Sequence, residues 1–213
     1  MPRPALDALE AHARLLTAWH LAINLTAHRT PERMALEHVA DSLTALPFVP
    51  PGCRLIDLGS GSGYPGLALA VAGLVGEAAL VDSIRKKARF LAVAAHAVSD
   101  AMRAAGGTPP NLAVIDSRAE ELASDGDHAE AWDLVTVRAV ARMKRLAELA
   151  LPLLRPGGSL ICWKRDDGRG SLARELEEAQ VTVGRLGGRR PEVHQVTLAP
   201  LADHRLVLVR RRR

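Results

Sequence analysis

Aromatic residues are scarce in this 213-residue chain, making up 3% of it, and only two cysteines are present. A core with so few aromatics must be built from Ala, Leu and Val, which favours helices packed on a sheet over an all-β sandwich. Cys53 and Cys162 lie far apart in the sequence, lack CxxC spacing and adjoin apolar runs. This arrangement argues against a disulfide framework or a zinc site, so we expect two small buried hydrophobic side chains and no metal.

Long apolar runs are absent as well. The run from Leu67 to Val75 is far shorter than the roughly 20 residues that a bilayer-spanning helix needs. The first residues, Met1 to Asp7, do not follow the basic-then-apolar order of a secretory signal. We therefore expect a cytoplasmic protein without a membrane partner.

The net charge of +4 is modest but unevenly distributed. From residue 160 onward twelve Lys/Arg stand against seven Asp/Glu, a surplus of five, whereas the earlier residues carry sixteen against seventeen. The chain ends in four arginines, residues 210–213, and Arg185, Arg189 and Arg190 belong to the same region. Such a surplus indicates either a nucleic-acid contact or a solvated tail, and charge alone leaves both interpretations open.

The first 50 residues read as helices. Apolar residues recur at near-helical spacing from Leu6 to about Leu21, and a second helical stretch runs from Pro31 to about Leu46, with Thr30 as its N-cap. Pro47 and the run Pro50-Pro51-Gly52 then break the chain. This pattern predicts an N-terminal helical extension over residues 1–50 and a core domain over residues 51–213.

The rest of the chain alternates between strand-like and helical runs. Five strand-like runs are separated by helical runs of ten or more residues, which predicts βαβ units and a parallel sheet with helices on both faces. Two final runs are joined by a short loop and predict an antiparallel hairpin. The fold class is therefore α/β and Rossmann-like, with a mainly parallel seven-stranded sheet formed by residues 54–58, 79–82, 112–115, 134–137, 159–163, 193–198 and 205–210.

A glycine-rich stretch, residues 57–66, joins the first strand to a helix. Glycines there let the backbone turn sharply and approach a bound nucleotide. The spacing Gly61-x-Gly63-x-x-Gly66 formally matches the dinucleotide fingerprint, so NAD has to be weighed. A turn that merely connects strand and helix is the alternative without function.

One acidic residue, Asp57, favours S-adenosylmethionine over NAD, and a second, Asp82, suits both cofactors. Asp57 precedes the first glycine, Gly59, by two positions, where a carboxylate attracts the positively charged methionine moiety and would repel a phosphate. Asp82 ends the second strand, where it can accept hydrogen bonds from the hydroxyls of a ribose, a role that suits either cofactor. The final hairpin also favours a methyltransferase. We therefore expect a class I S-adenosylmethionine-dependent methyltransferase.

Taken in order, the motifs resemble one family, that of ribosomal RNA small-subunit methyltransferase G, also called glucose-inhibited division protein B. The resemblance extends from Asn24 to Val209, almost the whole chain. The chain departs from the family in two places: members often carry an extra short segment before the first helix, and Arg165 follows Lys164, where members commonly have glycine. The motifs that carry the resemblance are Asn24-Leu25-Thr26 with Arg29, His38-x-x-Asp41-Ser42, residues 57–66, Asp82-Ser83 with Lys86-Lys87, Arg118-Ala119-Glu120, Val137-Arg138-Ala139 and Leu154-x-Pro156-Gly157-Gly158.

The resemblance implies the reaction and most of the site. The family methylates N7 of a guanine in the decoding-centre loop of 16S rRNA, so the implied partner is the small ribosomal subunit and the implied product is S-adenosylhomocysteine. We expect the protein to act as a monomer. Cofactor contacts are implied for Gly59, Tyr64, Ala119, Glu120 and Arg138, and the physical argument adds Asp57, Gly61 and Asp82.

Guanine N7 has a free lone pair and no proton to lose, so its methylation needs positioning more than a general base. We therefore expect no single indispensable catalytic residue. Asn24, His38 and Asp41 flank the junction between extension and core, and with Arg118 they are the candidates to border the RNA side of the pocket. Judged on spacing alone, helix caps or interdomain hydrogen bonds would explain the first three better than a role at the pocket.

Three other functions remain open on the sequence alone. A nicotinamide-dependent oxidoreductase would bind NAD(H) tightly. A non-catalytic ribosome-binding module would bind S-adenosylmethionine without turnover. A small-molecule methyltransferase would need an apolar lid over its substrate, which the sequence does not show.

Overall fold

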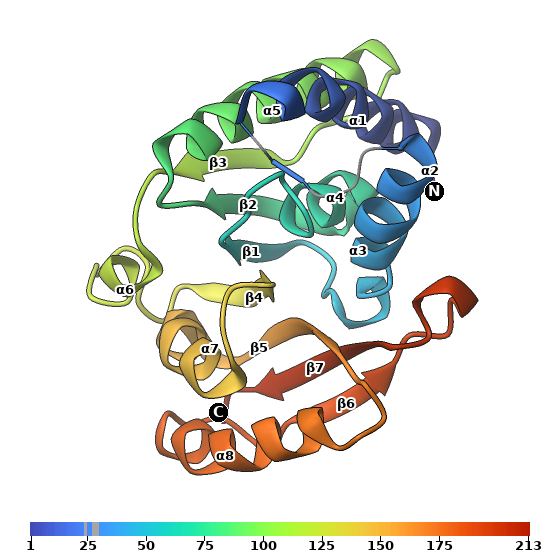
Figure 1. The fold of residues 1–213 in the computed structure, drawn as a ribbon. Coiled ribbons are helices and arrows are strands. Elements are labelled where there is room, and N and C mark those ends of the chain that lie inside the picture. The colour runs from blue at the N-terminus through green and yellow to red at the C-terminus, as the bar shows by residue number, and fades with distance from the viewer. Residues whose placement is uncertain (24, 27–29) are drawn as a thin grey trace. The chain divides into compact units, whose positions relative to one another are not determined.

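The structure is a computed structural model that describes residues 1–23, 25–26 and 30–213. The described chain separates into two compact units, residues 1–117 and residues 118–213. The first unit holds the predicted extension together with three strands (Figure 1). The boundary expected near residue 50 stays a prediction.

The predicted N-terminal helices are present. Helix α1 spans Arg3–Ile23, and α2 begins at Pro31, where the hydroxyl of Thr30 accepts a hydrogen bond from the backbone N–H of Arg33 at 3.3 Å, as expected of an N-cap. The second stretch is not a uniform α-helix, because a π-helical segment interrupts it. Its parts are α2 (Pro31–Met34), the π-helix Ala35–Ala40 and α3 (Asp41–Leu43), followed by a 3₁₀ turn at Leu46–Phe48.

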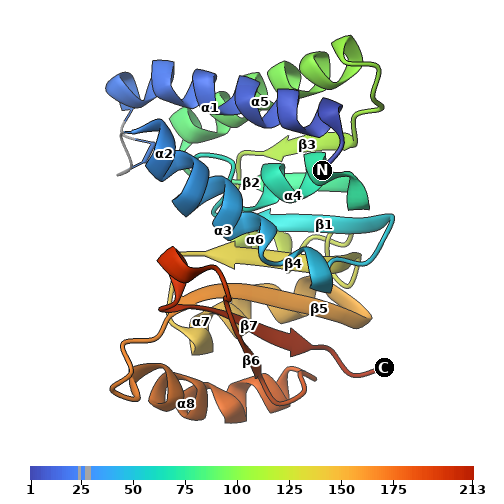
Figure 2. The same ribbon diagram turned by 90° about the vertical axis from the view of Figure 1, so that its right-hand side faces the viewer.

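The first unit contains three parallel strands in the order β3-β2-β1. Helix α1 lies along α5 in both views (Figures 1 and 2), and its apolar face enters the core with Leu9 and Leu16 against Phe90 and Leu91 of α5. The remaining elements of this unit are β1 (Cys53–Leu58), α4 (Gly66–Leu69) with the π-helix Ala70–Leu74, β2 (Val75–Val81), α5 (Arg85–Ala104) and β3 (Asn111–Ile115).

The second unit contains four strands in the order β4-β5-β7-β6. Strands β4 and β5 are parallel, and β7 runs antiparallel between β5 and β6, which confirms the predicted final hairpin. Its elements are α6 (Ala119–Leu122), β4 (Trp132–Arg138), α7 (Met143–Ala150), a 3₁₀ turn at Leu151–Leu153, β5 (Leu154–Arg165), α8 (Ser171–Arg185), β6 (Glu192–Gln195), a 3₁₀ turn at Ala199–Leu201 and β7 (His204–Arg210).

The predicted helical runs of ten or more residues between strands are wrong for several connections. Helix α6 has 4 residues and α7 has 8, whereas α5 has 20. Polar residues and Gly126 follow α6, and the carboxylate of Asp125 accepts a hydrogen bond from the backbone N–H of Asp127 at 3.0 Å. Such local side-chain bonds stabilise a turn in place of a longer helix.

Both cysteines are free and buried, as predicted. Burial raises the pKa of Cys162 to about 12, so its thiol is inert at neutral pH. Within the described part of the chain, no helix combines the length and apolar character that crossing a bilayer requires.

Candidate cofactor site at the glycine loop

The glycine loop begins where β1 ends. Gly59, Gly61 and Gly63 have φ angles of 70°, 54° and 89°, a region that side-chain-bearing residues rarely adopt. Ser60 connects the loop to β1 and β2: its hydroxyl donates to the carbonyl of Asp57 in β1 at 2.9 Å and accepts from the backbone N–H of Val81 in β2 at 3.1 Å. The sequence therefore specifies a fixed loop at the carboxyl end of parallel strands, where α/β sheets bind ligands.

Asp82, predicted to bind ribose, lies directly beside this loop. One carboxylate oxygen accepts from the backbone N–H of Gly61 at 3.0 Å and the other from the N–H of Ile84 at 2.9 Å. Each carboxylate oxygen has two lone pairs, so both keep acceptor capacity for hydroxyl groups. The carboxylate of Asp82 therefore holds the loop in place and can still bind a ligand.

Asp57 has a partner that the sequence did not reveal. Its carboxylate accepts from the backbone N–H of Gly66 at 3.1 Å, and its side chain is fully buried. A Cβ at position 66 would lie 2.5 Å from Cβ of Asp57, so only glycine fits there. Asp57 thus fixes the start of α4, and its contact with the methionine moiety stays a prediction.

Two histidines stack on Tyr64 in the loop. The ring centroids of His12 and Tyr64 are 4.6 Å apart, and those of His38 and Tyr64 are 4.8 Å apart with nearly parallel planes. All three rings are buried. The helical extension therefore supports the glycine loop through these rings, and the predicted cofactor contact of Tyr64 stays a prediction.

His12 was not predicted as part of the site. Its Nε2–H donates to the carbonyl of Ser62 at 2.8 Å, and burial lowers its pKa to about 4, so the ring is neutral. A Cβ at Gly63 would lie 2.8 Å from the ring. The sequence did contain a signal, because His12 falls on the apolar face of α1 between Leu9 and Leu16.

Of the candidate residues from the extension, His38 and Asp41 are described by the structure, and both are buried. His38 is buried, and its Nε2 lies 2.6 Å from the hydroxyl of Thr26. Its carbonyl accepts from the hydroxyl of Ser42 at 2.5 Å. Asp41 is also buried, within α3. Asn24 lies outside the described residues, so its role stays a prediction.

The remaining predicted residues belong to the second unit. Arg118 precedes α6, and its backbone N–H donates to the carboxylate of Glu121 at 3.3 Å. Ala119 and Glu120 open the helix, and Glu120 pairs with Arg145 of α7 at 2.5 Å. The pKa of Glu120 is lowered, first by its own backbone N–H and then by Arg145. These contacts fix α6 to α7.

Arg138 is the last residue of β4, opposite Trp163 of β5, at the carboxyl edge of these strands. Ala139 follows it with a φ of 58°, which is strained for a residue with a Cβ. Backbone strain of this kind concentrates at ligand sites. The predicted cofactor role of Arg138 agrees with this position and stays a prediction.

The residues of the glycine loop fit S-adenosylmethionine better than a dinucleotide. Segment 57–66 contains a carboxylate and no Lys or Arg, and Asp82 adds a second carboxylate beside it. A pyrophosphate would be repelled by Asp57, whereas a positively charged methionine moiety would be attracted, and Asp82 suits the ribose of either cofactor. The local chemistry therefore agrees with the cofactor predicted from the sequence.

Comparison with known proteins agrees with this geometry. The family model of rRNA small subunit methyltransferase G matches residues 5–195. The chain is 36% identical to Ribosomal RNA small subunit methyltransferase G of Symbiobacterium thermophilum, covering 98% of this chain and 82% of the relative. It is 39% identical to the protein of that name from Deinococcus deserti, covering 97% and 80%.

The fold also matches a solved structure. Fibrillarin from Aeropyrum pernix, in complex with natively bound S-adenosyl-L-methionine, is similar with a TM-score of 0.56 and 16% identity, covering 76% of this chain and 67% of fibrillarin. At this identity the likeness concerns the fold alone, and it confirms the predicted Rossmann-like fold. The loop geometry, the fold and the family match lead to one conclusion: this chain belongs to the rRNA small subunit methyltransferase G family.

Proposed function

We propose that this protein transfers a methyl group from S-adenosylmethionine to N7 of a guanine in the decoding-centre loop of 16S rRNA. The observation that carries the proposal is the glycine loop held by Asp82, in a chain whose relatives are named for methylation of small-subunit rRNA. Family membership favours this reaction over a nicotinamide-dependent oxidoreductase.

The chain's own residues would hold the cofactor at the ends of β1 and β2. Asp82, which holds Gly61, would accept hydrogen bonds from the ribose hydroxyls, and the carboxylate charge of Asp57 would attract the methionine moiety. Gly59, Gly61 and Tyr64 supply the backbone that approaches the nucleoside. Bound there, S-adenosylmethionine supplies an electrophilic methyl group on a positively charged sulfur.

Catalysis in this proposal is mainly positioning. The lone pair of guanine N7 attacks without losing a proton, so no general base is required. Asn24, His38, Asp41 and Arg118 are the candidates to contact the base, and Ala119, Glu120 and Arg138 are the further candidates to contact the cofactor. A carboxylate near the purine would stabilise the positive charge that the base gains.

The basic C-terminal region supplies the phosphate contacts. Arg189 donates its backbone N–H to the carbonyl of Arg210, and Arg212 donates to the carbonyl of Gly187, both at 2.8 Å, which brings two segments together. Arg211 is withdrawn from this surface because its guanidinium pairs with Glu130 and the carbonyl of Leu154. The exposed remainder, which we call the C-terminal basic cluster, consists of Arg185, Arg189, Arg190, Arg210, Arg212 and Arg213.

The cluster and the end of β4 lie at opposite edges of the second unit. Ser159, in the middle of β5, pairs with Arg210, whereas Trp163 near its end pairs with Arg138. An RNA held by the cluster must therefore be long enough to span this unit, as a folded rRNA is. We further propose that the protein acts in the cytoplasm as a monomer.

A transfer assay tests the proposed reaction. The protein is incubated with S-adenosylmethionine carrying a tritiated methyl group and with small or large ribosomal subunits from cells that lack the modification. The proposal predicts label in small-subunit RNA only. Cofactor binding without transfer to any RNA would overturn the proposal in favour of a non-catalytic module, and tight NAD(H) binding would favour the oxidoreductase.

A further inference from the structure

The loop after β4, residues 139–142, is an exposed segment at the carboxyl edge of the second unit. It begins with Ala139 in its strained conformation and continues with Val140, whose exposed fraction is 44%. A strained and exposed loop requires contacts that hold it, because its backbone gains little from regular hydrogen bonding. Those contacts come from β5 and α8.

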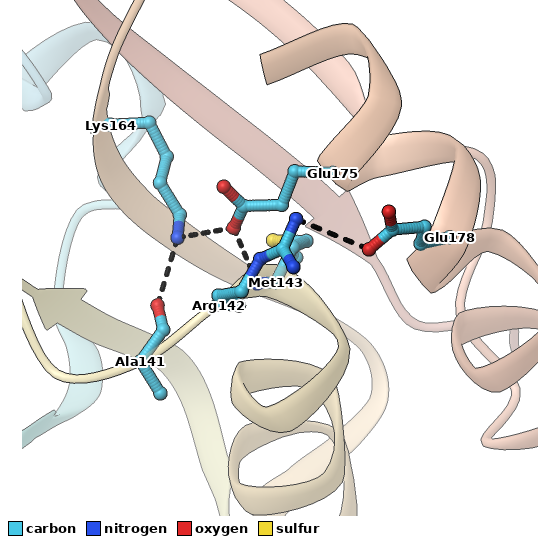
Figure 3. Close-up of polar contacts among 6 residues, drawn as sticks. All are labelled: Ala141, Arg142, Met143, Lys164, Glu175 and Glu178. Carbon is cyan, nitrogen blue, oxygen red and sulfur yellow. Dashed lines mark hydrogen bonds and ion pairs between the residues drawn. The ribbon is translucent and has the colours of Figure 1, made fainter. Parts of the chain in front are cut away.

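A lysine and a glutamate clamp the far end of this loop (Figure 3). The ammonium group of Lys164 donates to the carbonyl of Ala141 at 2.9 Å and to a carboxylate oxygen of Glu175 at 2.7 Å. The same carboxylate oxygen accepts from the backbone N–H of Met143 at 2.6 Å. One ion pair thus fixes a carbonyl in the loop and the first N–H of α7.

The pair is mostly withdrawn from water. The exposed fractions of the side chains are 12% for Lys164 and 17% for Glu175, whereas the nearby pair between Arg142 and Glu178 has 68% and 60%. Burying two charges costs desolvation energy that their attraction often only balances, so such a pair is weak evidence for added stability. What this pair does provide is a defined position for the loop.

We infer that Lys164 and Glu175 are positioning residues for methyl transfer. By holding residues 141 and 143, they fix the segment that connects to Arg138 and keep Ala139 and Val140 in place for the cofactor and the target base. The inference rests on the proposed function, in which the end of β4 contacts the cofactor. Neither side chain needs to touch a reacting atom.

Three variants and a matched control test the inference. Lys164→Met and Glu175→Gln each remove one charge of the pair, and the double variant removes both. Glu177→Gln is the control, because Glu177 is an exposed carboxylate on the same helix. For each protein one measures the thermal midpoint, the affinity for S-adenosylmethionine, kcat on small subunits, and hydrogen exchange of the amides of residues 140–143.

The expected results separate positioning from stability. Each single variant should lower the midpoint because one buried charge is left unpaired, and the double variant should recover it to within about 3 °C. All three should show faster exchange at residues 140–143, and the double variant should still lose roughly 10-fold or more in kcat because the loop is no longer fixed. The control should match the wild type.

Two outcomes would overturn the inference: a double variant that regains kcat together with its midpoint, or exchange at residues 140–143 that no variant changes. If the wild type transfers no methyl group, the proposed function fails by itself. In that case exchange and cofactor affinity decide the inference, which predicts faster exchange and an affinity weaker by roughly 10-fold in the double variant.

Discussion

A carboxylate oxygen of Asp82 lies 3.0 Å from the backbone nitrogen of Gly61, so the end of β2 holds the glycine loop directly. This contact makes Asp82 both a support for the loop and the expected ribose ligand. Asp82→Ala should therefore weaken the binding of S-adenosylmethionine by roughly 10-fold to 100-fold, since hydrogen bonds to a charged group contribute about 1.5–3 kcal/mol each. Titration calorimetry measures the change. Asp100→Asn, at an exposed site on α5, is the control, and equal affinity in both variants would contradict this role.

The junction between the loop and α4 has no room for a side chain at position 66. A Cβ there would lie 2.5 Å from Cβ of Asp57 and 2.7 Å from one of its carboxylate oxygens. Gly66→Ala should therefore lower the free energy of unfolding by about 1–3 kcal/mol, the usual cost of overpacking. Urea denaturation measures this, with Gly126→Ala as control because nothing lies within 4 Å of a Cβ there. Equal stabilities would show that the junction can relax.

Burial of His12 makes stability depend on pH. Its pKa is about 4 in the folded state and 6.5 in the reference state, so between these values the unfolded chain binds the extra proton. The stabilisation is complete above pH 6.5 and is lost as the pH falls towards 4, by about 3 kcal/mol. In His12→Gln the free energy of unfolding should fall less over this window than in the wild type.

The matched control for His12 is His96→Gln on the exposed side of α5. Free energies of unfolding measured by urea denaturation at several pH values between 7 and 4 give the comparison. If the wild type and His12→Gln lose the same stability over this window, the buried ring does not resist protonation as the structure indicates.

The C-terminal basic cluster should govern the salt dependence of RNA binding. Each phosphate contact contributes roughly 0.7–0.9 to the slope of log K against log salt concentration. Replacing Arg189 and Arg190 together by Gln should therefore reduce the slope by about 1–2 and weaken binding at low salt. Arg103→Gln on α5 is the control. A slope unchanged by the double replacement would assign these arginines to a solvated surface.

The sequence was sufficient to predict most strands because they are apolar runs bounded by breakers, but the strand predicted over residues 193–198 forms only at Glu192–Gln195. It misplaced the starts of two of them: β2 begins at Val75 and β5 at Leu154, several residues before the predicted runs. Gly76 lies inside β2, and Pro156-Gly157-Gly158 lies inside β5. Because these residues normally break strands, the sequence did not indicate that their backbone pairs with neighbouring strands. Such pairing depends on the neighbouring strands rather than on local preference.

The sequence indicated which residue types form the glycine loop, but it did not indicate which side chains contact one another. The glycines and Asp82 follow from a pattern that any nucleotide-binding strand end must satisfy. The stacking of His12 on Tyr64 and the pairing of Lys164 with Glu175 connect elements separated in the chain. No periodicity relates a strand lysine to a helix glutamate, so only the folded structure could reveal that pair.

The most direct test of the proposed reaction maps the methylated base. Small ribosomal subunits that lack the modification are incubated with the protein and S-adenosylmethionine, and N7-methylguanine is located by borohydride reduction and aniline strand scission. Arg138→Ala serves as the comparison. The account predicts cleavage at a single guanine of the decoding-centre loop with the wild type and its loss with the variant. The absence of any new cleavage, from a protein that binds the cofactor, would contradict guanine N7 methylation of this particle.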